Sequence, residues 1–120
     1  NQIVFTGFRN DVNSLMQKSE IFILSSRFEG LPMVLIEAMS QGMACISYDC
    51  KTGPSEVIRN GENGLLIEDQ NMEAMRAGLV ELIDNETLRK DLSLNAIRSL
   101  DRYSIQNIYN LWQDLINKVI

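Results

Sequence analysis

Histidine is absent from the 120-residue sequence, and cysteine and proline occur only twice each. The absence of histidine removes the commonest general base and the commonest metal ligand of enzymes. Cys45 and Cys50 are accompanied by no second cysteine pair that could complete a zinc site. Two unpaired thiols fit a reducing cytosol better than a secreted disulfide scaffold, and we expect Cys45 to pack as a small apolar side chain.

Long apolar runs are missing too, since the longest spans about four residues against the ~20 of a membrane helix. The first residues, NQIVFTGF, lack a basic stretch, a cleavage site and an initiating methionine, so we expect the natural N-terminus to lie upstream. A net charge of −5 argues against a nucleic-acid partner. We therefore expect a cytoplasmic protein, and a peripheral position at the inner face of the membrane stays open.

Four short apolar runs are continuous rather than alternating, which is typical of strands covered on both faces in a parallel sheet. Helical spacing of apolar residues separates them, so the pattern predicts βαβ units in an α/β, Rossmann-like domain with flanking helices. The expected strands are residues 3–5, 21–24, 44–46 and 65–67, and the expected helices between them are residues 11–18, 32–41 and 55–58.

From residue 71 onward the pattern is helical only. Asn71 is a suitable N-cap for a helix that ends near Ile83, and a second helix is expected over residues 86–100. Ser104 is a suitable N-cap for a third helix that ends near Val119. We expect residues 1–120 to form one partial domain, with an α/β part at residues 1–70 and a helical tail at residues 71–120.

Residues 25–39 follow a predicted strand and open a predicted helix, at the sheet edge where open α/β domains bind ligands. Gly30 is expected to permit a tight turn, and Pro32 suits the first helical position. The free N–H groups of Met33 and Val34 would then form an anion site that needs no cationic side chain. Glu29 and Glu37 bracket this site and could accept hydrogen bonds from sugar hydroxyls.

Simpler interpretations stay open for each of these side chains. Glu37 could face water on its helix, and Glu29 could be a loop carboxylate that interacts with the helix dipole. Arg27 could be solvated or form a local ion pair.

The segment SSRFEGLPMVLIEAMSQG at residues 25–42 is similar to the E-x7-E signature of family 4 glycosyltransferases, with Glu29 and Glu37 as the two glutamates. VFTGF at residues 4–8 resembles a strand and turn of the same family. GPSEVI at residues 53–58, NG at 60–61 and GLLI at 64–67 resemble a later family segment. The resemblance covers residues 4–68 in four ordered segments, and it implies the C-terminal, donor-binding domain of a retaining enzyme with the two-domain GT-B fold.

By this resemblance, Glu37 would bind the ribose of a nucleotide-diphosphate sugar, and Glu29 would bind the sugar hydroxyls as the catalytic residue. The N–H groups of Met33 and Val34 would hold the distal phosphate, and Gly30 and Leu31 would lie along the sugar. Contacts to the base would come from the turn at residues Phe8 and Arg9.

The resemblance also implies no metal and no cofactor, with a UDP-sugar as the most probable donor in polysaccharide or surface-glycan synthesis. A glycan or lipid-linked acceptor would bind through an N-terminal domain that these 120 residues do not include. The family's Arg/Lys pair, which neutralises the departing diphosphate, belongs to upstream strands. We therefore expect residues 1–120 alone to be inactive, and self-association of the piece stays open.

Three alternatives remain at this stage. A non-catalytic nucleotide-sugar-binding or regulatory subunit would have the same fold but would lack the upstream Arg/Lys pair. A flavodoxin-like signalling domain would need an acidic cluster after its first strand, and the sequence contains none there. A nucleotide-sugar epimerase would be distinguished by substrate assays.

Overall fold

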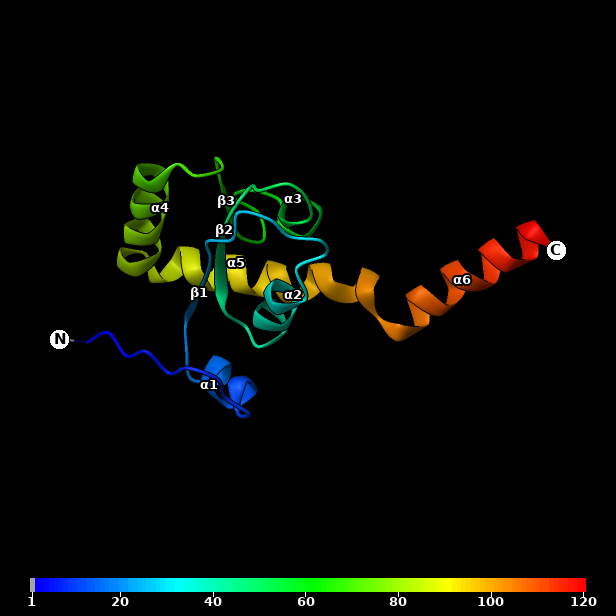
Figure 1. Ribbon diagram of the computed structural model, residues 1–120, viewed down its shortest axis with the longest axis horizontal. Coiled ribbons are helices and arrows are strands. Elements are labelled where there is room, and N and C mark those ends of the chain that lie inside the picture. The colour runs from blue at the N-terminus through cyan, green and yellow to red at the C-terminus, as the bar shows by residue number, and fades with distance from the viewer. Residues whose placement is uncertain (1) are drawn as a thin grey trace.

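A three-stranded parallel sheet organises the computed structural model, which describes residues 2–120 (Figure 1). Its strands are β1 (Ile21–Leu24), β2 (Ala44–Tyr48) and β3 (Leu65–Ile67), and they lie in the order β1-β2-β3. In the register of the sheet, Ile21 lies opposite Ala44 and Ile46 lies opposite Leu65. All five residues of the central strand are buried, as expected for a continuous apolar run covered on both faces.

Seven helical segments accompany the sheet among the described residues. They are α1 (Val12–Gln17), α2 (Met33–Ser40), α3 (Pro54–Val57), α4 (Met72–Asp84), α5 (Glu86–Ser99), the 3-10 helix η1 (Leu100–Tyr103) and α6 (Ile105–Val119). The expected N-caps are confirmed, because the Asn71 side chain accepts the N–H of Ala74 at 2.9 Å and the Ser104 hydroxyl accepts the N–H of Asn107 at 3.2 Å. Each cap satisfies one N–H group that has no carbonyl partner inside its helix.

The side chains of β2 alternate between two apolar clusters. Cys45 points into a cluster with α2, α3 and the end of α5, which includes Leu35 and Met39. Ile46 points into a second cluster with α4 and the middle of α5, which includes Leu82. The central strand therefore joins the helices on both faces of the sheet, and this sandwich fixes where the loops after each strand begin.

Residues 3–5, expected to form a strand, are not part of the sheet, and that prediction is wrong for the described chain. Their side chains are 80%, 78% and 95% exposed. The physical reason is the lack of a neighbouring strand, because an extended segment needs a partner for its N–H and C=O groups. If residues 3–5 are the third strand of the doubly wound order 3-2-1-4-5-6 and β1 is the fourth, two strands that the described chain does not contain separate residues 3–5 from the free edge of β1.

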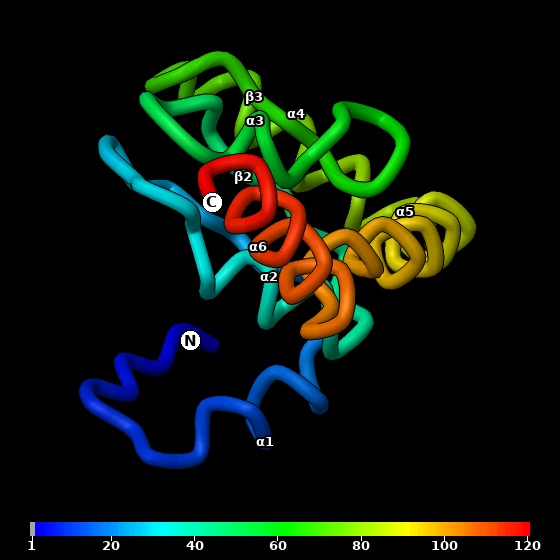
Figure 2. The backbone as a smooth tube through the Cα atoms, turned by 90° about the vertical axis from the view of Figure 1, so that its right-hand side faces the viewer, coloured from blue at the N-terminus to red at the C-terminus, as the bar shows by residue number. Residues whose placement is uncertain are grey.

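The tail consists of α4 and α5, which cover the sheet, and α6, which does not. Figure 1 shows α6 projecting from the body, and Figure 2 looks along it. No residue of α6 is buried, although it carries an apolar stripe. The stripe is Ile105, Ile108, Trp112, Leu115 and Val119. Among residues 2–120, no helix combines the length and apolar character needed to cross a membrane.

Candidate functional site

Two loops meet at the carboxyl edge of the sheet. The first connects β1 to α2 through residues 25–32, and the second connects β2 to α3 through residues 49–53. Because β1 and β2 are parallel neighbours, both loops leave the sheet at the same edge. This edge is where open α/β sheets bind their ligands, and it is where the sequence places Glu29.

Glu29 is held through both its backbone and its side chain. Its N–H donates to the carbonyl of Lys51 at 3.3 Å, and its carbonyl accepts the N–H of Thr52 at 3.0 Å. The hydroxyl of Ser26 donates to Oε1 of the Glu29 carboxylate at 2.6 Å. The side chain is half-buried. These contacts fix the loop between β1 and α2 at Glu29, the acidic residue of that loop.

The closest approach of the two loops is between Gly53 and Gly30. Gly53 has a φ of +104°, and a Cβ built on it would lie 1.8 Å from the carbonyl oxygen of Gly30. Only glycine combines this backbone conformation with this contact. Gly30 itself lies outside the left-handed region, and a Cβ there would meet no atom within 4 Å. The chain bends at Gly30 without using a conformation reserved for glycine, and Gly53 is the glycine whose φ and close contact the arrangement requires.

Helix α2 begins directly after the first loop. The N–H groups of Leu35 and Ile36 both donate to the carbonyl of Pro32, at 3.0 and 3.3 Å, so the helical ladder starts at Leu35. Pro32 is the N-cap rather than the first helical residue. The N–H groups of Met33 and Val34 precede the ladder at the positive end of the helix dipole, where an anion is stabilised.

Glu37 lies farther along α2 and is exposed. Among residues 2–120, its carboxylate takes part in no ion pair or hydrogen bond, and its backbone carbonyl accepts the hydroxyl of Ser40 at 2.6 Å. Arg27 is also exposed and forms no ion pair within the described chain. Leu31 is 47% exposed beside the start of α2. These three side chains are accessible to a ligand, and the charges of Glu37 and Arg27 have no ion-pair partner within residues 2–120.

Phe8 and Arg9 do not join this cluster. Phe8 is 94% exposed, and the Arg9 guanidinium donates to the carboxylate of Asp11 at 2.8 Å and 2.5 Å. This hydrogen bond holds the pKa of the Asp11 carboxyl below its usual value. Figure 1 shows the N-terminal segment on the side of α1, away from the loop between β1 and α2.

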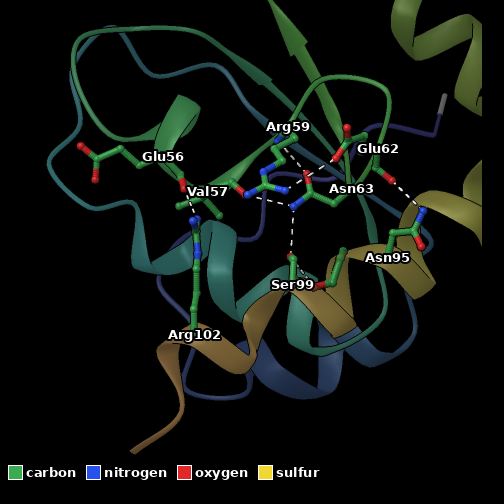
Figure 3. Close-up of polar contacts among 9 residues, drawn as sticks. Glu56, Val57, Arg59, Glu62, Asn63, Asn95, Ser99 and Arg102 are labelled. Carbon is green, nitrogen blue, oxygen red and sulfur yellow. Dashed lines mark hydrogen bonds and ion pairs between the residues drawn. The ribbon is translucent and has the colours of Figure 1, made fainter. Parts of the chain in front are cut away.

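A second polar cluster lies at the loop between α3 and β3 (Figure 3). The buried Asn63 side chain donates to the carbonyl of Val57 at 3.1 Å and to the hydroxyl of Ser99 at 3.0 Å, and it accepts the N–H of Arg59 at 2.7 Å. Arg102 donates to the carbonyl of Glu56, whose carboxylate points away from the cluster. A pocket of about 530 Å³ lies here.

The groups of this second cluster already have partners. No buried side-chain nitrogen or oxygen among residues 2–120 lacks a hydrogen bond. The cluster therefore joins the α3 loop to the end of α5, and it offers less to a ligand than the open edge around Glu29.

The two thiols are structural. Burial raises the pKa of Cys45 to about 12, so it stays protonated and is a poor nucleophile. Cys50 is also buried, and burial and the nearby carboxylates raise its pKa. The expectation that Cys45 packs as an apolar side chain is confirmed.

Sequence reasoning missed three features of the site: the Ser26 hydroxyl, the backbone of Lys51 and Thr52, and the close contact of Gly53. Ser26 lies three residues before Glu29, and this spacing in a turn was the one local signal available. The contacts from residues 51–53 join loops more than twenty residues apart and left no local pattern.

Comparison with known proteins identifies relatives for most of the chain. The family described as "Glycosyl transferases group 1" matches residues 1–99. The chain is similar to the amylovoran biosynthesis glycosyltransferase AmsD of Erwinia amylovora, with 37% identity over 106 residues, or 88% of this chain and 30% of AmsD. It is similar to the poly(glycerol-phosphate) alpha-glucosyltransferase of Bacillus subtilis, with 28% identity over 120 residues, or 100% of this chain and 18% of the relative.

Solved structures share the same fold. The apo form of the lipopolysaccharide outer core galactosyltransferase WaaB superposes with a TM-score of 0.83 and 27% identity, over 98% of this chain and 33% of WaaB. A variant of S. aureus TarM in complex with Fondaparinux, alpha-GlcNAc-glycerol and UDP superposes with a TM-score of 0.86 and 27% identity. The superposition covers 93% of this chain and 23% of the TarM chain. The expected α/β fold is confirmed, and the chain spans about a third or less of these relatives.

The loop contact at Gly53 leads to a stability prediction. Gly53→Ala should lower the free energy of unfolding by about 1–3 kcal/mol more than Gly61→Ala, because only the first places a Cβ against another backbone segment. Gly61→Ala is the matched control, since Gly61 also has a positive φ, +79°, but a Cβ there would meet no atom within 4 Å. Its loss should be about 1 kcal/mol from backbone strain alone. Denaturant unfolding measures both, and equal losses would contradict the close contact.

Proposed function

The chain belongs to the group 1 glycosyl transferases, and we propose that it is the donor-binding part of a retaining family 4 enzyme. In this proposal, the enzyme transfers a hexose-type sugar from a UDP-sugar to a glycan or lipid-linked acceptor in polysaccharide or surface-glycan synthesis. The observation that carries the proposal is the Glu29 carboxylate, which Ser26 holds in the loop that leads into α2, with Glu37 exposed on that helix.

The diphosphate would bind at the N-terminus of α2. The N–H groups of Met33 and Val34 precede the helical ladder, and the helix dipole adds a positive potential there. Such a site needs no cationic side chain, so a chain with a net charge of −5 can still bind an anion. The same N–H groups would stabilise the charge that develops on the diphosphate as it leaves the sugar.

The two glutamates would divide the polyol parts of the donor between them. Glu29 would accept hydrogen bonds from hydroxyls of the transferred sugar, because it is fixed in the loop that leads into α2, whose N-terminus is the proposed anion site. Glu37 would accept from the ribose hydroxyls, since it lies farther along α2 and its carboxylate has no protein partner among the described residues. A carboxylate can accept two hydroxyl groups at once, which suits a diol.

Several surfaces of the chain suggest that a longer polypeptide completes the enzyme. Within residues 2–120, strand β1 pairs only with β2, so its other edge is open, and residues 3–5 are exposed with no strand beside them. The apolar stripe of α6 is also uncovered. Exposed strand edges and apolar patches of this kind mark surfaces that pack against something else. Because the chain spans about a third or less of its relatives, the remaining chain is the occupant that we propose.

A pair of variants in the full-length enzyme separates the two glutamate roles, and each is the control for the other. Glu37→Ala should weaken the binding of free UDP by about 1–3 kcal/mol, because hydrogen bonds to a charged acceptor are lost. Glu29→Ala should leave UDP binding nearly unchanged but lower turnover of the UDP-sugar by about 10²-fold or more. Calorimetry with UDP and steady-state kinetics measure the two effects. The reverse pattern would mean that the roles are exchanged, and unchanged behaviour of both variants would reject the site.

The incomplete cleft leads to a second prediction. Purified residues 1–120 should bind UDP weakly, if at all, and should neither transfer nor hydrolyse UDP-glucose, UDP-galactose or UDP-N-acetylglucosamine. The proposed anion site on α2 belongs to this piece, but the proposed opposing domain and upstream cations do not. Mass in solution shows whether the piece pairs with another copy. A monomer that transfers sugar efficiently would overturn the proposal that the donor cleft needs further chain.

A further inference from the structure

We propose that Ser26 is a positioning residue that orients the carboxylate of Glu29 for the sugar. This role rests on the proposed function of Glu29, and a double-mutant cycle distinguishes the failure of the one from the failure of the other. The juxtaposition that carries it is a hydroxyl and a carboxylate in one loop, joined at 2.6 Å in a half-buried environment.

The backbone contacts alone do not orient the Glu29 side chain. Lys51 and Thr52 fix the peptide groups on either side of its Cα, but three side-chain torsions lie between Cα and the carboxylate. Among residues 2–120, the Ser26 hydroxyl is the hydrogen-bond donor that the structure gives this carboxylate, and no cation pairs with it. Ser26 therefore supplies the orientation that the loop backbone cannot.

The contact belongs to a strong class of hydrogen bond. An O–H donor bonded to an ionised oxygen typically lies at about 2.5–2.7 Å and is roughly twice as strong as a bond between neutral groups. Partial burial of the pair reduces the competition from water. A reacting group displaced by about 1 Å can lose on the order of 10² in rate, so a modest loss of orientation has a measurable effect.

The geometry also assigns the two carboxylate oxygens. Oε1 accepts the Ser26 hydroxyl and keeps one acceptor site, and Oε2, which accepts no hydrogen bond within residues 2–120, is open to a sugar hydroxyl. The Ser26 oxygen has used its one hydrogen and can only accept further hydrogen bonds. The pair thus presents an acceptor surface, which suits a neighbouring pair of sugar hydroxyls and disfavours a second carboxylate or a phosphate.

The test is a double-mutant cycle of Ser26→Ala and Glu29→Ala in the full-length enzyme. The donor is whichever of UDP-glucose, UDP-galactose and UDP-N-acetylglucosamine the unmodified enzyme turns over fastest. Ser26→Ala alone should lower kcat about tenfold or more, as expected for a lost hydrogen bond to a charged group. Free UDP should bind as before, and the melting temperature should stay the same. In the Glu29→Ala background, Ser26→Ala should cause no further loss.

Ser25→Ala is the matched control, because Ser25 is the adjacent exposed serine and makes no side-chain hydrogen bond within residues 2–120. It should leave kcat and UDP binding unchanged. Two results would overturn the positioning role. The first is that Ser26→Ala lowers kcat equally in the unmodified enzyme and in Glu29→Ala. The second is that Ser26→Ala leaves kcat unchanged although Glu29→Ala lowers it. Loss of both UDP binding and thermal stability in Ser26→Ala would assign Ser26 a purely structural role and would overturn it too. Normal turnover of Glu29→Ala would instead reject the proposed function of Glu29 itself.

Discussion

Contact between two loops at the carboxyl edge of the sheet determines where the charged groups of the site lie. Gly53 approaches the carbonyl of Gly30 so closely that no side chain fits between them, and two backbone hydrogen bonds beside this contact hold Glu29. The loops can meet there because β1 and β2 are adjacent and parallel, with Ile21 opposite Ala44. The buried central strand sets that register through the helices packed on its two faces. The position of one carboxylate thus depends on the packing of the whole core.

The carboxyl edge of the sheet is well packed, although other surfaces of the described chain have no partner. The body between β1 and α5 has two apolar clusters and satisfied buried polar groups, whereas the N-terminal segment, the free edge of β1 and the apolar stripe of α6 have no partner in the described chain. The groups proposed to bind a donor need orientation, and the contacts of Glu29 with Ser26, Lys51 and Thr52 supply it locally. To exclude water from the proposed donor site and to complete an acceptor site, a second domain is needed. We therefore assign these roles to the rest of a longer polypeptide.

Elements with local signals could be predicted from the sequence, and contacts between distant segments could not. Residues 21–24, 44–46 and 65–67 are strands as expected, because their continuous apolar runs need cover on both faces. The caps Asn71 and Ser104 could be predicted because the side chain of each bonds to an N–H group only three residues away. Residues 3–5 have the same apolar character but pair with no strand of the described chain, so the strand predicted from their residue types alone is absent. The roles of Glu29 and Glu37 stay predictions, since only a bound donor distinguishes a ligand carboxylate from a solvated one.

A crystal structure of the full-length enzyme with a bound UDP-sugar tests the central claim most directly. The account predicts the distal phosphate within hydrogen-bond distance of the N–H groups of Met33 and Val34, and a sugar hydroxyl on Glu29. It also predicts the ribose on Glu37. A diphosphate bound instead at Arg59 and Arg102, beside the pocket between the α3 loop and α5, would contradict the account.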